Sequence, residues 1–250
     1  MRMSDAATDV LVLDCDDDRR ELAGSTLVVA IDDTGHEAFA DSNFPVFGLG
    51  GCCFLVKDYR RLIDGPWNFM CQRFFPEHKR PMHAADLWQP TDEQLDAFRH
   101  FFEKFQFFRV ATTISKQAAN EIHADFISVV GASLLSRIAD VGKWAEFDRL
   151  FIIVEQSDRI QNRILRSLDG GTLHRDGKNI TIELGHLPKS ACMAALEVAD
   201  FIIHTAGAQT RNRIAGNVKP RIDFEIIFRN VPEFLTSFME ITKISQAENA

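Results

Sequence analysis

The chain has 250 residues, of which 46% are hydrophobic and 26% are charged, with 14 glycines and 8 prolines. These globular proportions exclude a disordered chain, a collagen-like repeat and a disulfide scaffold. The formal net charge of −8 opposes nonspecific binding to a polyanion, but it does not exclude an enzyme that reaches phosphates through bound cations.

Cysteine spacing and hydropathy indicate in which cellular compartment the protein is expected. The five cysteines form no C-x-x-C pair, which argues against a zinc site and predicts reduced thiols. The longest nearly apolar run, residues 44–56, has 13 residues, fewer than the roughly 18 of a membrane helix. The first residues lack the basic-then-apolar order of a signal peptide. We therefore expect a cytoplasmic protein without a membrane segment.

In chain order, the acidic residues 1–24 predict an N-terminal arm, either a disordered, solvated charge run or a peripheral strand. Residues 25–250 are expected to form a single domain. Apolar runs bounded by turn residues predict strands at 25–35, 44–56, 106–115, 148–156 and 179–185. Apolar periodicity and capping residues predict helices at 57–75, 91–105 (with Thr91 as N-cap), 117–140, 159–168 and 191–208. The predicted class is α/β, a mixed five-stranded sheet flanked by helices, with a helical insertion at about 57–105.

Two strands end directly in a carboxylate. Asp32 follows the apolar run VVAI, and Glu155 follows FIIV. Ligands of open α/β sheets bind beyond the carboxyl ends of strands, so these two acids are candidates for one site. Each also has a plainer interpretation. Asp32 or Asp33 could form an Asx-turn toward Gly35, and Glu155 could be a solvent-facing loop acid.

The last predicted helix carries three polar residues on an otherwise apolar stretch. Glu197, Asp200 and His204 are spaced i, i+3 and i+7 and therefore share one face. Such a stripe is usually the water-facing side of a helix, but here it contains no Lys or Arg. Two acids at this spacing repel each other unless a cation lies between them or one is protonated. Together with the strand acids, the stripe predicts a metal site.

Carboxylate oxygens are the ligands that Mg²⁺ and Mn²⁺ prefer. Two such ions about 3.5–4 Å apart can activate an attacking water and stabilise the leaving oxygen of a phosphodiester. The expected cofactor is therefore Mg²⁺ or Mn²⁺.

Four stretches resemble the DUF3800 family of uncharacterised proteins: AIDDTG (30–35), VFGLGGCCFLV (46–56), FIIVEQSDR (151–159) and LPKSACMAALEVADFI (187–202). The order of a strand Asp, a later strand Glu and an acid-x-x-acid pair on the last helix also resembles the RNase H-like superfamily, in its resolvase- or integrase-like carboxylate arrangement. The resemblance spans about residues 27–207. It implies an RNase H-like fold.

The resemblance also implies roles for four acids. Asp32, Glu155 and Asp200 correspond to metal-binding, catalytic carboxylates, with Glu197 as a fourth metal-binding residue. Glutamine is frequent in the family where this chain has Glu197, which leaves the role of Glu197 open. The family's opening D-E-S-G pattern is also changed here, to Asp-Asp-Thr-Gly.

Several basic residues are candidates for substrate binding. Lys189, ahead of the last helix, could meet a phosphate, although a helix cap by Ser190 is the plainer interpretation of this segment. His83, in the proline-rich loop 76–90, could reach the site or lie in a surface turn, and His204 is a further candidate. Arg211 and Arg213 belong, with Lys219 and Arg221, to the clearest basic cluster, which could position a nucleic-acid backbone. The same cluster also fits a solvated loop.

The function predicted from these features is a divalent-metal-dependent nuclease that hydrolyses phosphodiester bonds of nucleic acid. The nuclease assignment rests on fold analogy. The alternative is a non-catalytic protein of the same fold that binds a partner or nucleic acid. It draws on the Phe-rich insertion, residues 67–108, which is core if buried and a homo-oligomer or partner interface if exposed.

Overall fold

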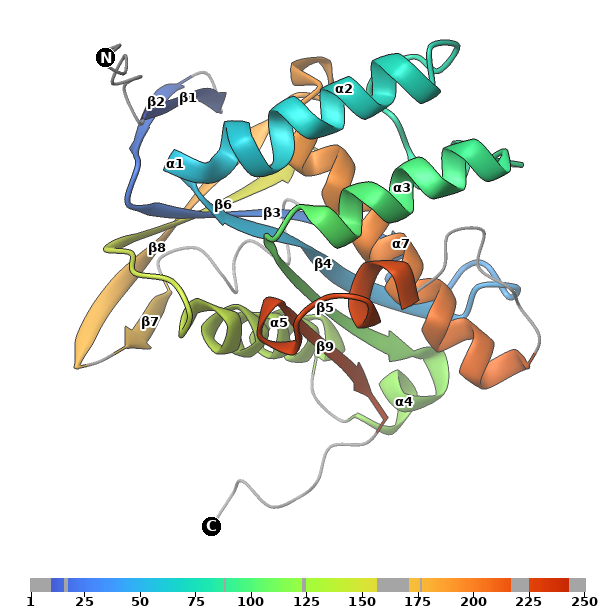
Figure 1. The fold of residues 1–250 in the computed structure, drawn as a ribbon. Helices are drawn as coiled ribbons and strands as arrows, with labels where there is room; N and C mark the ends of the chain where they lie inside the picture. The colour runs from blue at the N-terminus through green and yellow to red at the C-terminus, as the bar shows by residue number, and fades with distance from the viewer. Residues whose placement is uncertain are drawn as a thin grey trace, which may run out of the picture.

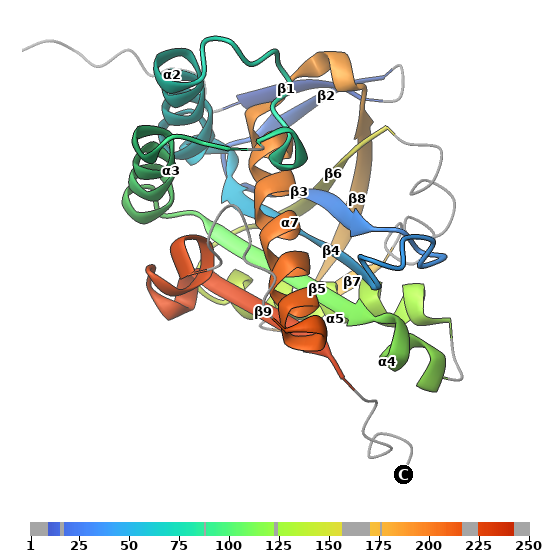
Figure 2. The same ribbon diagram turned by 90° about the vertical axis from the view of Figure 1, so that its right-hand side faces the viewer.

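The computed structural model describes residues 10–15, 18–87, 89–122, 125–156, 171–175, 177–216 and 225–242. Within them, a mixed seven-stranded sheet has the order β7-β8-β6-β3-β4-β5-β9, and β1 and β2 pair separately (Figure 1). Helix α7 (Ala194–Ala215) covers one face of the sheet and α5 (Phe126–Gly142) the other (Figure 2). The α/β class is confirmed, whereas the expected number of five strands is wrong.

The five expected strands form one block of the sheet. They are β3 (Thr26–Gly35), β4 (Val46–Leu55), β5 (Phe108–Ser115), β6 (Arg149–Glu155) and β8 (Lys178–Leu187). Strand β4 is antiparallel to β3 and β5, while β6 is parallel to both β3 and β8. The sheet gains two edge strands, β7 (Thr172–Arg175) and β9 (Thr236–Ile241). Each buries a single residue, so neither has the apolar run by which strands are recognised.

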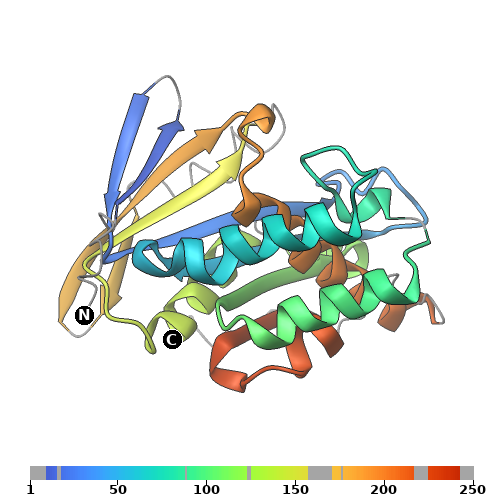
Figure 3. The ribbon, with the colours of Figure 1, turned by 45° about the horizontal axis from the view of Figure 1, so that its top comes forward.

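The acidic N-terminal segment contains a hairpin of β1 (Val10–Cys15) and β2 (Asp18–Ala23). In Figure 3 this hairpin, in blue, lies beside β8. Leu13, Cys15 and Leu22 are buried in the apolar layer on the α7 side of the sheet. The charged side chains between them face solvent, as in a half-buried antiparallel ribbon. Three apolar residues therefore anchor a segment whose charge alone favoured a solvated arm.

Helices fill the insertion between β4 and β5. Helix α1 (Val56–Tyr59), the π-helical turn η1 (Arg60–Asp64) and α2 (Gly65–Phe74) follow one another without a break. After the short η2 (Ala84–Asp86) comes α3 (Asp92–Lys104). Thr91 caps α3 as predicted: its hydroxyl accepts the Gln94 N–H, and the Gln94 side chain accepts the Thr91 N–H.

The helix expected at 117–140 is two helices, α4 (Lys116–Glu121) and α5. Asp125 accepts the Ile127 N–H through its side chain and so starts α5 afresh. The helix expected at 159–168 lies outside the described residues. Among the described helices, none combines the length and apolar character needed to cross a membrane.

Two apolar layers cover the two faces of the sheet. The α7 layer takes alternate strand residues, Val28, Ala30, Phe151 and Ile153, and the α5 layer takes Val29, Ile31, Ile152 and Val154. The adjacent Cys52 and Cys53 enter opposite layers, as their positions on a strand predicted. Asp32 and Glu155 come next in the α7-facing series. Strand periodicity therefore assigns both acids to the side of the sheet that carries α7.

Glycines let α7 approach this face closely. A Cβ atom on Gly51 would lie 1.8 Å from the Ala30 carbonyl oxygen and 3.0 Å from Ala199 Cβ. One on Gly48 would lie 3.3 Å from Ile203 Cδ1. Side chains at these positions would push the helix away from the sheet.

The Phe-rich insertion is mostly core. Phe98 and Phe101 of α3 are buried against the fully buried Trp67 of α2, and the buried Phe102 packs against Phe101. Phe69 is the exception, with 68% of its surface exposed. The phenylalanine stripe is therefore mainly a packing feature.

Candidate functional site

A small pocket lies where β3 and β6 end. These strands run parallel with Ile31 opposite Val154, so the next residues, Asp32 and Glu155, come to the same edge of the sheet. The first two turns of α7, loop 76–90 and the turn before α7 complete the wall. Six residues singled out from the sequence line this pocket: Asp32, His83, Glu155, Lys189, Glu197 and Asp200.

Asp32 is in the least favourable electrostatic position of the pocket acids. Its Oδ1 accepts the N–H of Asp33 at 2.8 Å. Burial raises the pKa of Asp32 well above its usual value, and the charges of Asp200, Asp33 and Glu155 raise it further. The pocket thus concentrates negative charge around a half-buried carboxyl, where a bound cation would be stabilised.

Asp200 holds loop 76–90 against α7. Its Oδ2 accepts the Ala84 N–H at 2.6 Å and lies 3.7 Å from His83 Nδ1. This carboxylate raises the pKa of His83. Asp200 therefore has a protein partner on one oxygen and an imidazole beside it.

Glu155 is paired with a lysine. The Nζ atom of Lys189 lies 3.2 Å from Glu155 Oε2. The two side chains differ in exposure, 64% for Lys189 and 20% for Glu155. An exposed ammonium therefore covers a largely buried acid.

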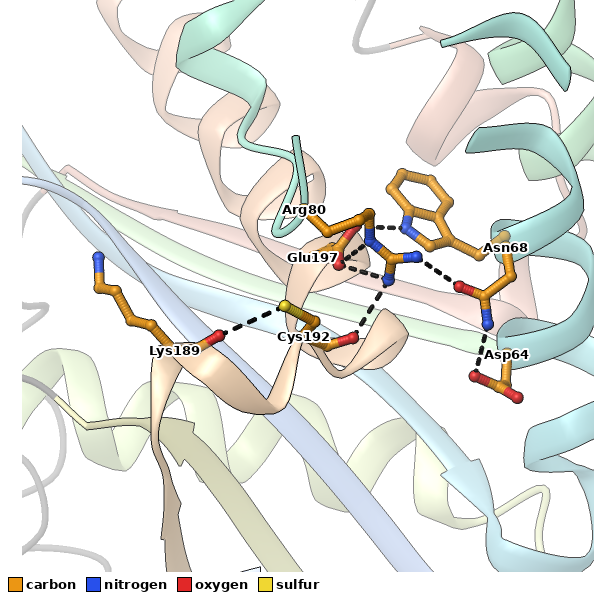
Figure 4. A network of polar contacts seen from close by, with 7 residues as sticks. Asp64, Asn68, Arg80, Lys189, Cys192 and Glu197 are labelled. Atoms are coloured by element: carbon orange, nitrogen blue, oxygen red, sulfur yellow. Dashed lines mark hydrogen bonds and ion pairs between the residues drawn. The ribbon is translucent and has the colours of Figure 1, made fainter. Parts of the chain in front are cut away.

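Glu197 differs from the other pocket acids because protein donors engage both of its oxygens (Figure 4). Oε2 accepts the indole N–H of Trp67 at 2.9 Å, and Oε1 accepts the Nε–H of Arg80 at 2.5 Å. Arg80 also donates to Asn68 Oδ1 at 2.5 Å and to the Cys192 carbonyl at 3.1 Å. Burial raises the pKa of Glu197, whereas Trp67 and Arg80 act against that rise.

Arg80 and Trp67 were not anticipated from the sequence. Arg80 lies in a loop with other charged residues, where no periodicity distinguishes it, and Trp67 has the pattern of an ordinary core aromatic. Their common partner, Glu197, carried the only sequence signal for this network. An acid on an apolar helix without Lys or Arg needs a partner from another segment.

The remaining candidates do not line the pocket. His204 is half-buried further along α7. The Arg211 guanidinium lies 4.9 Å from the centre of the Phe44 ring, and Arg213 pairs with Glu240 of β9 at 2.7 Å. Lys219 and Arg221 fall outside the described residues. Arg211 and Arg213 thus lie toward the C-terminal end of α7.

Among the residues that the structure describes, no group of three or more His, Cys, Asp and Glu side chains is arranged so that it could hold a metal ion. Glu155 and Asp200 instead face Lys189 and the His83–Ala84 segment. In comparisons with protein-family models, curated proteins and solved structures, none matches this chain.

Proposed function

We propose that this protein is a divalent-metal-dependent nuclease of the RNase H-like superfamily, related to the DUF3800 family, that hydrolyses phosphodiester bonds of nucleic acid in the cytoplasm. The observation that carries the proposal is the pocket shared by Asp32, Glu155 and Asp200, in which desolvation and the charges of neighbouring acids, Asp200 foremost, raise the pKa of Asp32. Such a perturbed, crowded carboxyl is typical of a functional site.

The order of elements supports the proposal. Strands β5-β4-β3-β6-β8 form a contiguous mixed block, and its acids lie at the end of the central β3, at the end of the neighbouring β6 and on the closing helix α7. This is the sequence of strand Asp, strand Glu and helix acid on which the resemblance rests. Fold analogy alone would not define the chemistry, so the acids have to be considered individually.

The donor set fits a hard divalent cation. Mg²⁺ keeps several waters and uses one or two protein carboxylates together with substrate oxygens. It therefore needs no preformed group of three close ligands. We assign Asp32, Glu155 and Asp200 as the residues that hold the ion, which would activate water and stabilise the leaving oxygen. Glu155 would have to release Lys189, while Asp200 can keep the Ala84 N–H on Oδ2 and offer Oδ1.

The other pocket residues have supporting roles in this proposal. Glu197 positions Arg80, and Arg80 holds loop 76–90 against α2 and the start of α7. His83 borders Asp200 at the pocket wall. We assign no step to Arg211 and Arg213, since their side chains contact Phe44 and Glu240.

The test is cleavage of labelled DNA and RNA, as single strands, duplexes and branched molecules, with Mn²⁺ or Mg²⁺. We expect Asp200→Asn to lose cleavage and keep its fold, because the amide oxygen can still accept the Ala84 N–H. The matched control is Asp96→Asn, an exposed acid of α3 paired with Arg99, which should cleave like the wild type.

Cleavage by the wild type and Asp96→Asn, and not by Asp200→Asn, would support the proposal. Undiminished cleavage by Asp200→Asn would contradict the assigned site. A folded wild type that cleaves nothing in this panel would contradict the nuclease assignment and favour the non-catalytic alternative, a protein that binds a partner or nucleic acid.

A further inference from the structure

Lys189 provides the permanent positive charge in the pocket wall. Of the described residues that line the pocket, it is the one Lys or Arg. The nearby Arg80 is committed to Glu197, Asn68 and the Cys192 carbonyl. Figure 4 shows the Lys189 side chain extending away from this network. Its ammonium instead lies 3.2 Å from Glu155.

The backbone fixes the place of Lys189. Strands β6 and β8 pair Glu155 with Leu187, and the Gln156 N–H donates to the Leu187 carbonyl at 2.8 Å. Lys189 follows two residues later, in the short helix η3 (Lys189–Ala191), where the Ala191 N–H donates to the Pro188 carbonyl at 2.8 Å. The sheet register and this turn together set the lysine beside the acid.

The contact between the Lys189 ammonium and Glu155, by contrast, is weak enough to be displaced. An ion pair with an exposed lysine contributes little stability, because water solvates the ammonium almost as well. A divalent cation carries twice the charge and binds a carboxylate oxygen directly. Glu155 is the less exposed partner of the pair, so displacement of the ammonium would uncover a carboxylate that already lines the pocket.

We propose that Lys189 is a built-in counter-cation: its ammonium neutralises Glu155 until a divalent cation displaces it, and it then contacts a phosphodiester at the mouth of the pocket. This inference rests on the proposed function, since it assumes that the pocket binds a metal ion. The ammonium and the metal compete for Glu155. The metal and the phosphodiester, in contrast, favour each other's binding.

The first arm of the test is calorimetric titration of the full chain with Mn²⁺ alone. Lys189→Met should bind Mn²⁺ about three- to fivefold more tightly than the wild type, the range expected for loss of an exposed ion pair. Lys143→Met is the matched control, because Lys143 is also exposed and pairs with an aspartate, Asp140, at 2.9 Å. It removes the same charge and should leave Mn²⁺ affinity unchanged.

The route of the effect is tested in a Glu155→Gln background. There the ammonium has no carboxylate to cover, so Lys189→Met should no longer tighten Mn²⁺ binding. The second arm measures dimethyl phosphate binding at saturating Mg²⁺, where Lys189→Met should weaken binding about three- to fivefold.

Three results would overturn the inference and leave the metal site intact: unchanged or weaker Mn²⁺ binding by Lys189→Met, the same tightening in the Glu155→Gln background, or unchanged dimethyl phosphate binding. Absence of Mn²⁺ binding by the wild type and every variant is a different outcome. It would overturn both this inference and the proposed metal-dependent function.

Discussion

Glu197 and Asp200 are three residues apart on α7, yet their surroundings differ in kind. Glu197 is 3% exposed, and Arg80 and Trp67 satisfy its carboxylate. Asp200 shares its pocket with Asp32 and Glu155, and its partners are a backbone N–H and a neighbouring imidazole. Glu197 is thus a buried acid balanced within the protein, whereas Asp200 belongs to a cluster of acids that, under the proposed function, binds a cation. Proteins retain the second arrangement, which costs stability, mainly where function requires it.

The largest expected effect on stability comes from the Glu197–Arg80 pair, whose charges balance each other. Glu197→Gln leaves the half-buried Arg80 without its counter-charge, and we expect it to lower the free energy of unfolding by about 3 kcal/mol. Urea denaturation at neutral pH measures this loss. The double variant Arg80→Met, Glu197→Leu should recover part of it, because neither charge is then left unpaired. A loss below about 1 kcal/mol in the single variant would mean that the pair is not an internally balanced unit.

Among the pocket acids, loss of a charge should change the free energy of unfolding in the opposite direction. Asp32→Asn removes one of the repelling charges and should raise the free energy of unfolding at neutral pH, by less than Glu197→Gln lowers it. The pKa of Asp32 is raised in the folded protein, so its contribution is fully present below about pH 4 and is lost as pH rises through the folded pKa.

Urea denaturation from pH 4 to pH 8 tests this sign. The stability of the wild type, relative to that of Asp32→Asn, should fall as the pH rises. If Asp32→Asn is less stable than the wild type at pH 7, the carboxylates in the pocket are not repelling one another.

The smallest effect is expected at an exposed pair outside both regions. Arg149 of β6 forms a two-pronged contact with Glu183 of β8, including a 2.6 Å bond from Nη2 to Oε2, and lowers the pKa of Glu183. Its stabilisation is present above the usual glutamate pKa and is lost as pH falls through the lowered one. Both side chains are about one-third exposed, so Glu183→Gln should cost about 0.5 kcal/mol in the same assay. A cost as large as that of Glu197→Gln would remove the distinction that we draw between buried and exposed pairs.

The sequence was sufficient to predict where the pocket acids lie, because each of them belongs to a regular strand or helix pattern. Alternation along VVAID and FIIVE gives the sheet face of Asp32 and Glu155, and the parallel pairing of β3 with β6 brings them to one edge. The polar stripe on α7 indicated Asp200 as a candidate site residue. The partners of these acids were harder to predict, because they come from loop 76–90 and α2, whose placement depends on tertiary packing.

The fold predicted from the sequence was wrong in two places, because apolar patterns miss both a helix cap and the pairing of edge strands. Apolar periodicity continues across residues 117–140, and it does not reveal that Asp125 ends one helical register and starts another. Strands β7 and β9 are held by pairing with β8 and β5, and each buries only one residue. Edge strands depend on neighbouring backbone for hydrogen bonds, which local composition does not record.

The central claim is that Asp32, Glu155 and Asp200 hold a divalent cation. Its most direct test is a crystal of the full chain soaked in MnCl₂, with an anomalous difference map calculated from the diffraction data. We expect a peak in the pocket about 2.1 Å from carboxylate oxygens of Asp32, Glu155 and Asp200. The Lys189 ammonium should then have moved away from Glu155. A map without a peak in this pocket, or with manganese bound only elsewhere on the protein, would contradict the account.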